Sequence, residues 1–365
     1  MSSSPGVPQY QFIDAIRGIA ILLVLLVHVA QRFPVEGGVI QGVFQFAQMG
    51  VQLFFFASAY TLCNSWFNRV GGERRVLLFY VRRLFRIWPA YCAAILFYVL
   101  FDIAVDGEVD VSLASVLANL FLVHGFFPAA NNSVVPGGWS IATEVLFYVL
   151  FPPLMVVMEW VGSLLRYRLL VLTVLTLFVM GCSWFFDVIS VWELENNSFP
   201  YFSILVQFPV FALGVAYYFS RDRMAGLSPI FCFSASVVLF FGLAVLFPVY
   251  KDEMALVYPS LAGVCFLFLF DALSKVELDY GVLARIGVYS YSMYLVHYLF
   301  ANKAAALTAP LFVALGGAVV GVLIHYTVSL IVVFYLARLS HYLIEVPSMA
   351  MGRNVAKSLL RSHSE

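Results

Sequence analysis

The chain contains 365 residues, of which 63% are hydrophobic and only 11% charged, and its mean hydropathy is +0.95. Soluble domains carry about 25% charged residues, so this sequence has too few polar side chains to cover a water-soluble globule. The formal net charge of zero at pH 7 gives no electrostatic reason to expect nucleic-acid binding. The five cysteines show neither CxxC nor Cys/His spacing, so no metal site is predicted.

Apolar runs of the length that an α-helix needs to cross a bilayer, about 20 residues, follow one another along most of the chain. We therefore expect an all-α polytopic membrane bundle of about ten transmembrane helices, in a single domain over residues 1–365. Residues 1–10 and 348–365 are expected to be tails. The expected spans are 11–33, 44–66, 87–105, 139–160, 168–186, 201–220, 228–248, 254–273, 286–308 and 311–338.

The charged residues between the spans orient the expected bundle. Loops rich in arginine and lysine stay on the cytoplasmic side of a membrane, and here basic loops alternate with acidic ones. Both tails are therefore expected to face the cytoplasm. The basic residues are Arg69, Arg74, Arg75, Arg82, Arg83, Arg86, Arg166, Arg168, Arg221, Arg223, Lys275, Arg285, Arg338, Arg353, Lys357 and Arg361, and the acidic ones are Asp106, Glu108, Asp110, Asp187, Glu193, Glu195, Asp252 and Glu253.

The first span contains Arg17 and His28, and ionisable residues inside a membrane usually mark a function or a buried structural pair. Eleven residues make about three helical turns, so both side chains share one face, roughly 16 Å apart along the axis. Each has a structural alternative: Arg17 can anchor the helix beside Asp14, and His28 can be an interfacial histidine. Together, on an otherwise apolar helix, they favour a shared polar shaft.

A cluster of arginines precedes the third span, and Arg82, Arg83 and Arg86 lead directly into it. Guanidinium groups suit phosphates, of which coenzyme A carries several. The preference of arginine for the cytoplasmic side of a membrane is enough to explain one or two of these arginines. Their density favours an anionic ligand, or anionic lipid headgroups, as well.

Residues 111–127 are apolar and long enough for a helix, but a full crossing there would move Arg166 and Arg168 to the outer side. We therefore expect an outer-face interfacial or re-entrant helix that leads into the loop 128–138. Backbone that enters a membrane without crossing it normally lines a protein cavity. This loop is thus a candidate wall of a site.

Glu144 lies just inside the fourth span and enters from the same expected side as His28. A carboxylate beside an imidazole fixes its tautomer and stabilises its protonated form, which a general base requires. The structural alternative is that Glu144 interacts with the positive end of its helix, with Ser140 as the cap.

His297, on the ninth span, is expected to line the same cavity or to be a core histidine bonded to a neighbouring helix. His124, His325 and Glu345 receive no role from their spacing.

Six segments in this order resemble motifs of the acyltransferase-3 family of integral membrane acyltransferases, and the resemblance covers most of the chain. An arginine followed by ten residues and a histidine occurs by chance, whereas six motifs in the expected order are strong evidence of a resemblance. The matching segments are 17–28, 50–58, 82–91, 136–144, 290–297 and 345–347.

The resemblance implies a ten-helix bundle in a bacterial inner membrane that moves an acyl group, in our expectation acetyl, from cytoplasmic acyl-CoA to a hydroxyl of an extracytoplasmic or lipid-linked glycan. Acyl-CoA is then a co-substrate, and no permanently bound cofactor is expected. The oligomeric state, homo-oligomers included, stays open. The expected residues are His28 and Glu144 for catalysis, Arg17, Arg82, Arg83 and Arg86 for donor binding, and Trp139, Ser140 and His297 for substrate binding.

The sequence departs from the family pattern at Gln52, where an acidic residue is often found, and at Val296 and Val346, which replace a Trp and an Arg. Many members also carry a fused hydrolase-like domain outside the membrane, and here we expect the stand-alone form.

We expect direct transfer, in which His28 takes the proton of the acceptor hydroxyl as it attacks the thioester, because no Ser or Cys stands out as a nucleophile. The alternative is a secondary transporter of an anionic or sugar-linked metabolite, which also needs intramembrane His, Arg and Glu.

Overall fold

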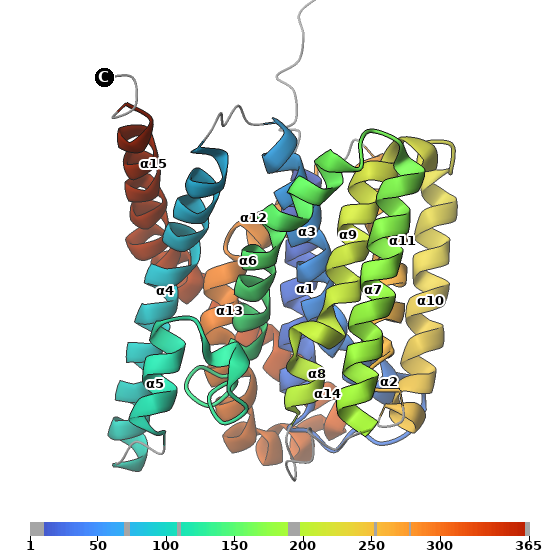
Figure 1. The fold of residues 1–365 in the computed structure, drawn as a ribbon. Coiled ribbons are helices and arrows are strands. Elements are labelled where there is room, and N and C mark those ends of the chain that lie inside the picture. The colour runs from blue at the N-terminus through green and yellow to red at the C-terminus, as the bar shows by residue number, and fades with distance from the viewer. Residues whose placement is uncertain are drawn as a thin grey trace, which may run out of the picture.

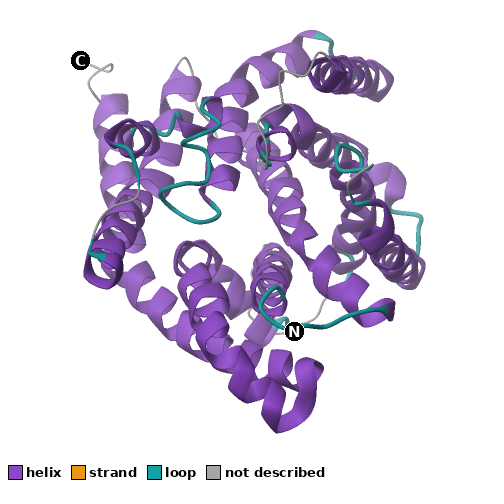
Figure 2. Cartoon of the chain, turned by 90° about the horizontal axis from the view of Figure 1, so that it is seen from below, coloured by secondary structure: helices purple, strands orange, loops and turns teal. Residues whose placement is uncertain are grey.

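The computed structural model describes residues 11–68, 74–107, 111–188, 198–251, 254–276 and 279–361, and these residues form helices and loops without strands. Figure 2 shows the helices end-on. Arg69, Glu108, Asp110, Glu193, Glu195, Asp252, Glu253 and the tail residues 1–10 and 362–365 lie outside the described residues.

The α-helices follow one another with short connections, as expected for a polytopic membrane protein. Their bounds are Gln11–Ala30 (α1), Gly38–Phe46 (α2), Gly50–Asn68 (α3), Arg75–Asp106 (α4), Leu113–Leu120 (α5), Gly138–Trp160 (α6), Leu165–Val188 (α7), Phe199–Phe202 (α8), Ile204–Met224 (α9), Pro229–Tyr250 (α10), Tyr258–Ser274 (α11), Gly281–Val288 (α12), Ser290–Tyr298 (α13), Ala305–Ser340 (α14) and Val346–Arg361 (α15). Two π-helical turns, η4 (Leu299–Ala304) and η5 (His341–Glu345), flank α14.

Eight stretches of described helix are long and apolar enough to cross a membrane. The last of them, Ser290–Leu360, folds back on itself, because the backbone of Gly317 is non-helical (φ 81°, ψ 172°) and residues on either side of it pair in antiparallel order. Thr308 bonds to His325, and further out Ser292 bonds to Ser340. Counting these two legs separately, and adding the shorter apolar helix α11, gives the ten passes that the sequence predicts.

Two helices are longer than expected. α4 begins at Arg75 rather than near residue 87, so Arg82, Arg83 and Arg86 lie on a helix and not in a loop. Residues 348–361, placed in a tail, are helical in α15, which packs along α4. Gly352 allows this approach, since a Cβ there would lie 2.6 Å from Cβ of Phe85.

The connections that carry the basic residues gather at one end of the bundle. The end of α3, the start of α4, the α6–α7 and α9–α10 connections and the end of α15 all lie at the upper end in Figure 1, whereas α2, α5 and α8 lie in its lower half. The basic segments therefore share one end of the molecule.

The segment 111–127 does not cross the bundle, as expected. It forms the eight-residue helix α5 and a short 3-10 turn, His124–Phe126. The indole Nε1 of Trp88, on α4, donates to the carbonyl of Leu120 over 2.8 Å. The segment thus packs beside α4 and leads into the first residue of α6.

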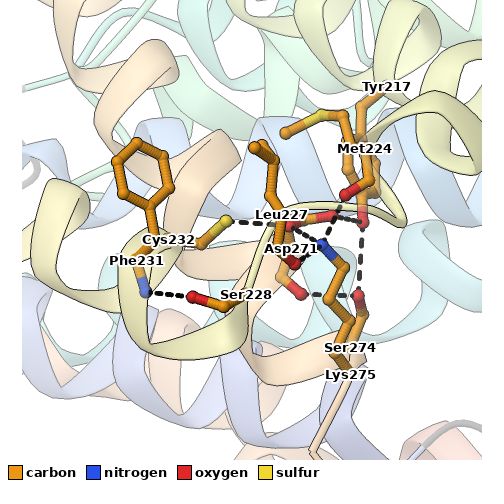
Figure 3. A network of polar contacts seen from close by, with 9 residues as sticks. All are labelled: Tyr217, Met224, Leu227, Ser228, Phe231, Cys232, Asp271, Ser274 and Lys275. Atoms are coloured by element: carbon orange, nitrogen blue, oxygen red, sulfur yellow. Dashed lines mark hydrogen bonds and ion pairs between the residues drawn. The ribbon is translucent and has the colours of Figure 1, made fainter.

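A buried carboxylate joins α9, α10 and α11 (Figure 3). Asp271 is 1% exposed and accepts hydrogen bonds from Tyr217 and Cys232, while Nζ of Lys275 lies 2.5 Å from its Oδ2. Lys275 also donates to the carbonyl oxygens of Met224 and Leu227 after α9. Because each charge has a partner, we interpret this network as a structural link between the three helices and not as a ligand-binding site.

The helix α1, which carries Arg17 and His28, is held by a close contact with α12. A Cβ on Gly287 would lie 1.7 Å from the carbonyl oxygen of Asp14, and one on Gly18 would lie 2.3 Å from that of Leu283. Only glycine fits at either position, so the two backbones touch.

We expect Gly287→Ala to separate α1 from α12 and to destabilise the protein by about 1–3 kcal/mol, the usual cost of overpacking. Thermal unfolding of the detergent-solubilised protein measures this. Gly242→Ala on α10 is the matched control, because no atom lies within 4 Å of a Cβ there and alanine favours a helix by about 0.5–1 kcal/mol. Equal melting temperatures for the two variants would contradict the assigned contact.

Candidate active site

A cavity lies between α1, α3, α4, α6 and α13, with about 580 Å³ of empty space when the open solvent at its mouth is counted. Its walls combine apolar side chains with a small number of polar ones, which is typical of a small-molecule site. Three of the residues predicted from ionisable positions, Arg17, Arg86 and Glu144, line it, and so does Ser140. These four residues, from three separate stretches of sequence, are therefore brought to one space.

Glu144 projects into this cavity and is held by two hydroxyl groups. Ser58 donates to its Oε1 over 2.6 Å and Tyr148 donates to the same oxygen over 2.5 Å. Tyr148 lies four residues along α6 and so falls on the same helix face. The carboxyl group is thus fixed within the bundle rather than at the helix end.

Arg17 and Arg86 share the cavity with Glu144 but are not held in a close ion pair with it. Neither Arg17 nor Arg86 forms an ion pair within 4.0 Å among the described residues, and guanidinium groups stay protonated in proteins. Arg83 lies over the ring of Tyr148, 5.5 Å from its centroid. Arg82 is half-buried on α4 but is not among the lining residues. Two cations facing one carboxyl group make the cavity suitable for an anionic ligand.

His28 lies at the other end of α1, in the helix's last turn and outside the cavity lining. Its Nδ1 is 3.1 Å from Oε1 of Gln31. Its ring centroid lies 5.1 Å from that of His297 and 5.3 Å from that of Tyr298. The residue predicted as a base therefore sits among rings of α13.

One hydrogen bond and two ring contacts lead from the cavity to His28. Ser140 donates to the hydroxyl of Tyr294 over 2.8 Å, and both residues line the cavity. The Tyr294 ring is 5.1 Å from the His297 ring, which is the same distance from His28. Tyr294 and His297 of α13 therefore lie between the cavity and His28, whereas His28 and His297 do not line the cavity themselves.

Two expected contacts are absent from the described residues. Glu144 and His28 share no hydrogen bond, because Glu144 accepts from Ser58 and Tyr148 while His28 lies against Gln31. Trp139 does not line the cavity. It stacks on Phe202 with 4.5 Å between ring centroids and supports the start of α6 from behind.

The remaining polar positions have structural partners. Gln52, at the position that departs from the family pattern, bonds to Gln207 over 2.8 Å. His325 bonds to Thr308 and to a backbone carbonyl. Glu345 accepts from Ser292 and lies 3.3 Å from Nδ1 of His341. None of them lines the cavity.

Tyr148 and Tyr294 are two of the cavity residues that sequence reasoning did not assign to the site. The signal was present, because Tyr148 follows Glu144 by four residues and Tyr294 precedes His297 by three, the spacings of one helix face. Tyrosine is common in this chain, with 20 copies, so spacing alone did not single these out.

The chain belongs to a family of membrane acyltransferases: the family's acyltransferase domain matches residues 10–338. A curated relative is the peptidoglycan O-acetyltransferase OatA of Listeria monocytogenes serovar 1/2a, which is 26% identical over 165 residues. The match covers 41% of this chain and 25% of the relative, so the chain spans about a quarter of that protein's length. No solved structure matches.

His124 ties the re-entrant segment to the start of α6. Its Nε2 lies 3.1 Å from the carbonyl oxygen of Gly138 and the same distance from the hydroxyl of Tyr91. Burial lowers the pKa of His124 to about 4, so the ring stays neutral and its Nε2–H donates to the carbonyl.

Because this pKa is lower in the folded chain than the value of 6.5 in an unfolded one, the unfolded chain binds a proton first as the pH falls. We expect stability to decrease between pH 6.5 and pH 4, by about 3 kcal/mol at the lower end. Melting temperatures at pH 7 and pH 4.5 measure this. His124→Gln, which keeps a donor but does not titrate, should show a smaller difference, and an equal one would contradict the assignment.

Proposed function

We propose that the protein moves an acetyl group from acetyl-CoA to a hydroxyl of a glycan, as a membrane O-acyltransferase. The observation that carries this proposal is the cavity in which Arg17 and Arg86 form no close ion pair, together with the contacts through Tyr294 and His297 that lead from it to His28. The family supplies the reaction class, acyl transfer. A donor with anionic groups at one end and a reactive thioester at the other suits such a path.

The donor would bind with its phosphates toward the arginine end of the shaft. Arg86 and its neighbours on α4 belong to the half of that helix nearest the basic end of the bundle, where a cytoplasmic donor would arrive. Guanidinium groups bind phosphate oxygens in pairs of hydrogen bonds. The pantetheine arm would then pass Ser140 and Tyr294 and bring the thioester toward His28.

The transfer step needs one base and no covalent intermediate on the protein. His28 would take the proton from the acceptor hydroxyl while the hydroxyl oxygen bonds to the acyl carbon. The carbon–sulfur bond breaks, and coenzyme A leaves as a thiolate that takes up a proton to give the free thiol. The products are the acylated glycan and coenzyme A.

The acceptor would be an extracytoplasmic or lipid-linked glycan in a bacterial inner membrane. His28 lies at the end of α1 opposite the basic end of the bundle, so an acceptor would approach from the outer side. The relative's name gives peptidoglycan as its acceptor, and peptidoglycan is a reasonable first candidate here.

We expect His28→Ala to lower transfer by at least about 100-fold, the contribution of a general base, while acetyl-CoA binding persists. Mass spectrometry of envelope glycans from cells that express the wild type, His28→Ala or neither measures the added acetyl mass. Undiminished acetylation by a well-expressed His28→Ala would refute its role. No acetyl mass with the wild type would move the transporter alternative forward.

We expect Arg86→Gln to weaken binding of acetyl-CoA to the purified protein by about 10- to 100-fold, because a charge-assisted hydrogen bond contributes about 1.5–3 kcal/mol. Isothermal titration in detergent measures the affinity. Arg166→Gln is the matched control, since Arg166 is exposed at the start of α7 and contacts only its neighbour Tyr167. Equal affinities for both variants would place the donor elsewhere.

A further inference from the structure

His297 is the most completely buried group of the shaft, with 0% of its surface exposed. Its Nδ1 lies 2.6 Å from the carbonyl oxygen of Tyr294, one turn earlier on α13. A carbonyl oxygen only accepts hydrogen bonds, so Nδ1 carries the proton and Nε2 of the neutral ring presents a lone pair. The backbone of α13 thus selects the tautomer.

That lone pair has no partner. The Nε2 of His297 is buried and forms no hydrogen bond with any described residue. An unsatisfied buried acceptor costs free energy, and most such groups in folded proteins are paired, so an exception calls for an explanation. We therefore expect a hydrogen-bond donor to reach Nε2 of His297 during the catalytic cycle.

His28 is in a position to supply that donor. Its Nδ1 faces the amide oxygen of Gln31, so Nδ1 carries the proton and the Nε2 of a neutral His28 is also a lone pair. Two lone pairs do not bond, which agrees with the missing contact. With 5.1 Å between the ring centroids, rotation of the His28 ring brings the two nitrogens to hydrogen-bond length, about 3 Å.

We propose that His297 is the positioning residue for His28, and that its Nε2 accepts a hydrogen bond from Nε2–H of His28 only after His28 has become protonated. This rests on the proposed function, with His28 as the base, and gives His297 the role that the sequence assigned to Glu144. An interaction that exists only when charge has developed stabilises the transition state and not the resting state.

Each proton in this sequence of events has a source and a destination. The acceptor hydroxyl gives its proton to Nε2 of His28 as the new carbon–oxygen bond forms and the carbon–sulfur bond breaks. The proton is then shared between the two imidazoles while the thiolate of coenzyme A leaves. The thiolate takes this proton, and both rings return to their neutral, unbonded state.

The test compares two variants that differ in hydrogen-bonding capacity. His297→Gln keeps an acceptor oxygen near the former Nε2, whereas His297→Leu keeps bulk but removes the acceptor. Inverted membrane vesicles with their own glycan are supplied with acetyl-CoA on the exposed cytoplasmic face, and the maximal rate and the KM for acetyl-CoA are measured per amount of folded protein. His325→Leu, which removes another buried histidine with partners of its own, is the matched control.

We expect His297→Leu to lower the maximal rate by about 10- to 100-fold, the contribution of a hydrogen bond to a charged group, with little change in KM. His297→Gln should recover most of the rate, and His325→Leu should keep it. An unchanged rate in His297→Leu, or equal losses in the Leu and Gln variants, would overturn the role of His297. Wild-type vesicles that transfer no acetyl group would instead refute the proposed function, and the role of His297 with it.

Discussion

The structure depends on holding charged side chains inside an apolar bundle, where each uncompensated charge is costly. Asp271 shows one solution, since Lys275 and two hydroxyl- or thiol-bearing side chains surround it and nothing is left unpaired. The cavity shows the opposite arrangement. Arg17 and Arg86 line it together with Glu144, yet neither arginine forms an ion pair within 4.0 Å among the described residues. The bundle thus pairs Asp271 directly with Lys275 but leaves Arg17 and Arg86 without a close ion pair. This arrangement suits the cavity to an anionic ligand.

The backbone around the cavity serves the same end. The segment 111–127 packs beside α4 without crossing the bundle, and its buried His124 bonds to the first residue of α6. Ser140 and Glu144, near this start of α6, line the cavity. The α1–α12 contact at Gly287 fixes the helix that carries Arg17 and His28. The α13 backbone sets the tautomer of His297. Irregular backbone within a membrane protein is normally found where it lines a cavity, but the loop 128–137 supports the start of α6 and is not among the lining residues.

The sequence predicted the helical class, the ten passes and the non-crossing segment, because hydrophobic length and the distribution of arginines are set by the bilayer itself. It also singled out Arg17, Arg86 and Glu144, because ionisable side chains inside a membrane are costly, and these three line one cavity, whereas His28, Arg82 and Arg83 do not line it. It did not predict which of them touch. Glu144 was paired with His28 because both enter from one side, but the rotation of α6 about its axis turns Glu144 toward Ser58 and Tyr148. Helix rotation depends on packing against neighbours and leaves no periodic signal.

The central claim is that the donor lies along the shaft with its thioester at His28 and its phosphates at the arginines. The most direct test is photocrosslinking with an acyl-CoA analogue that carries its photoreactive group on the acyl chain, followed by peptide mapping. The account predicts labelling of the end of α1 and of α13, around His28 and Tyr298, which acetyl-CoA should suppress. Labelling confined to the first turns of α4 or to α15 would place the acyl group at the basic end and contradict the account.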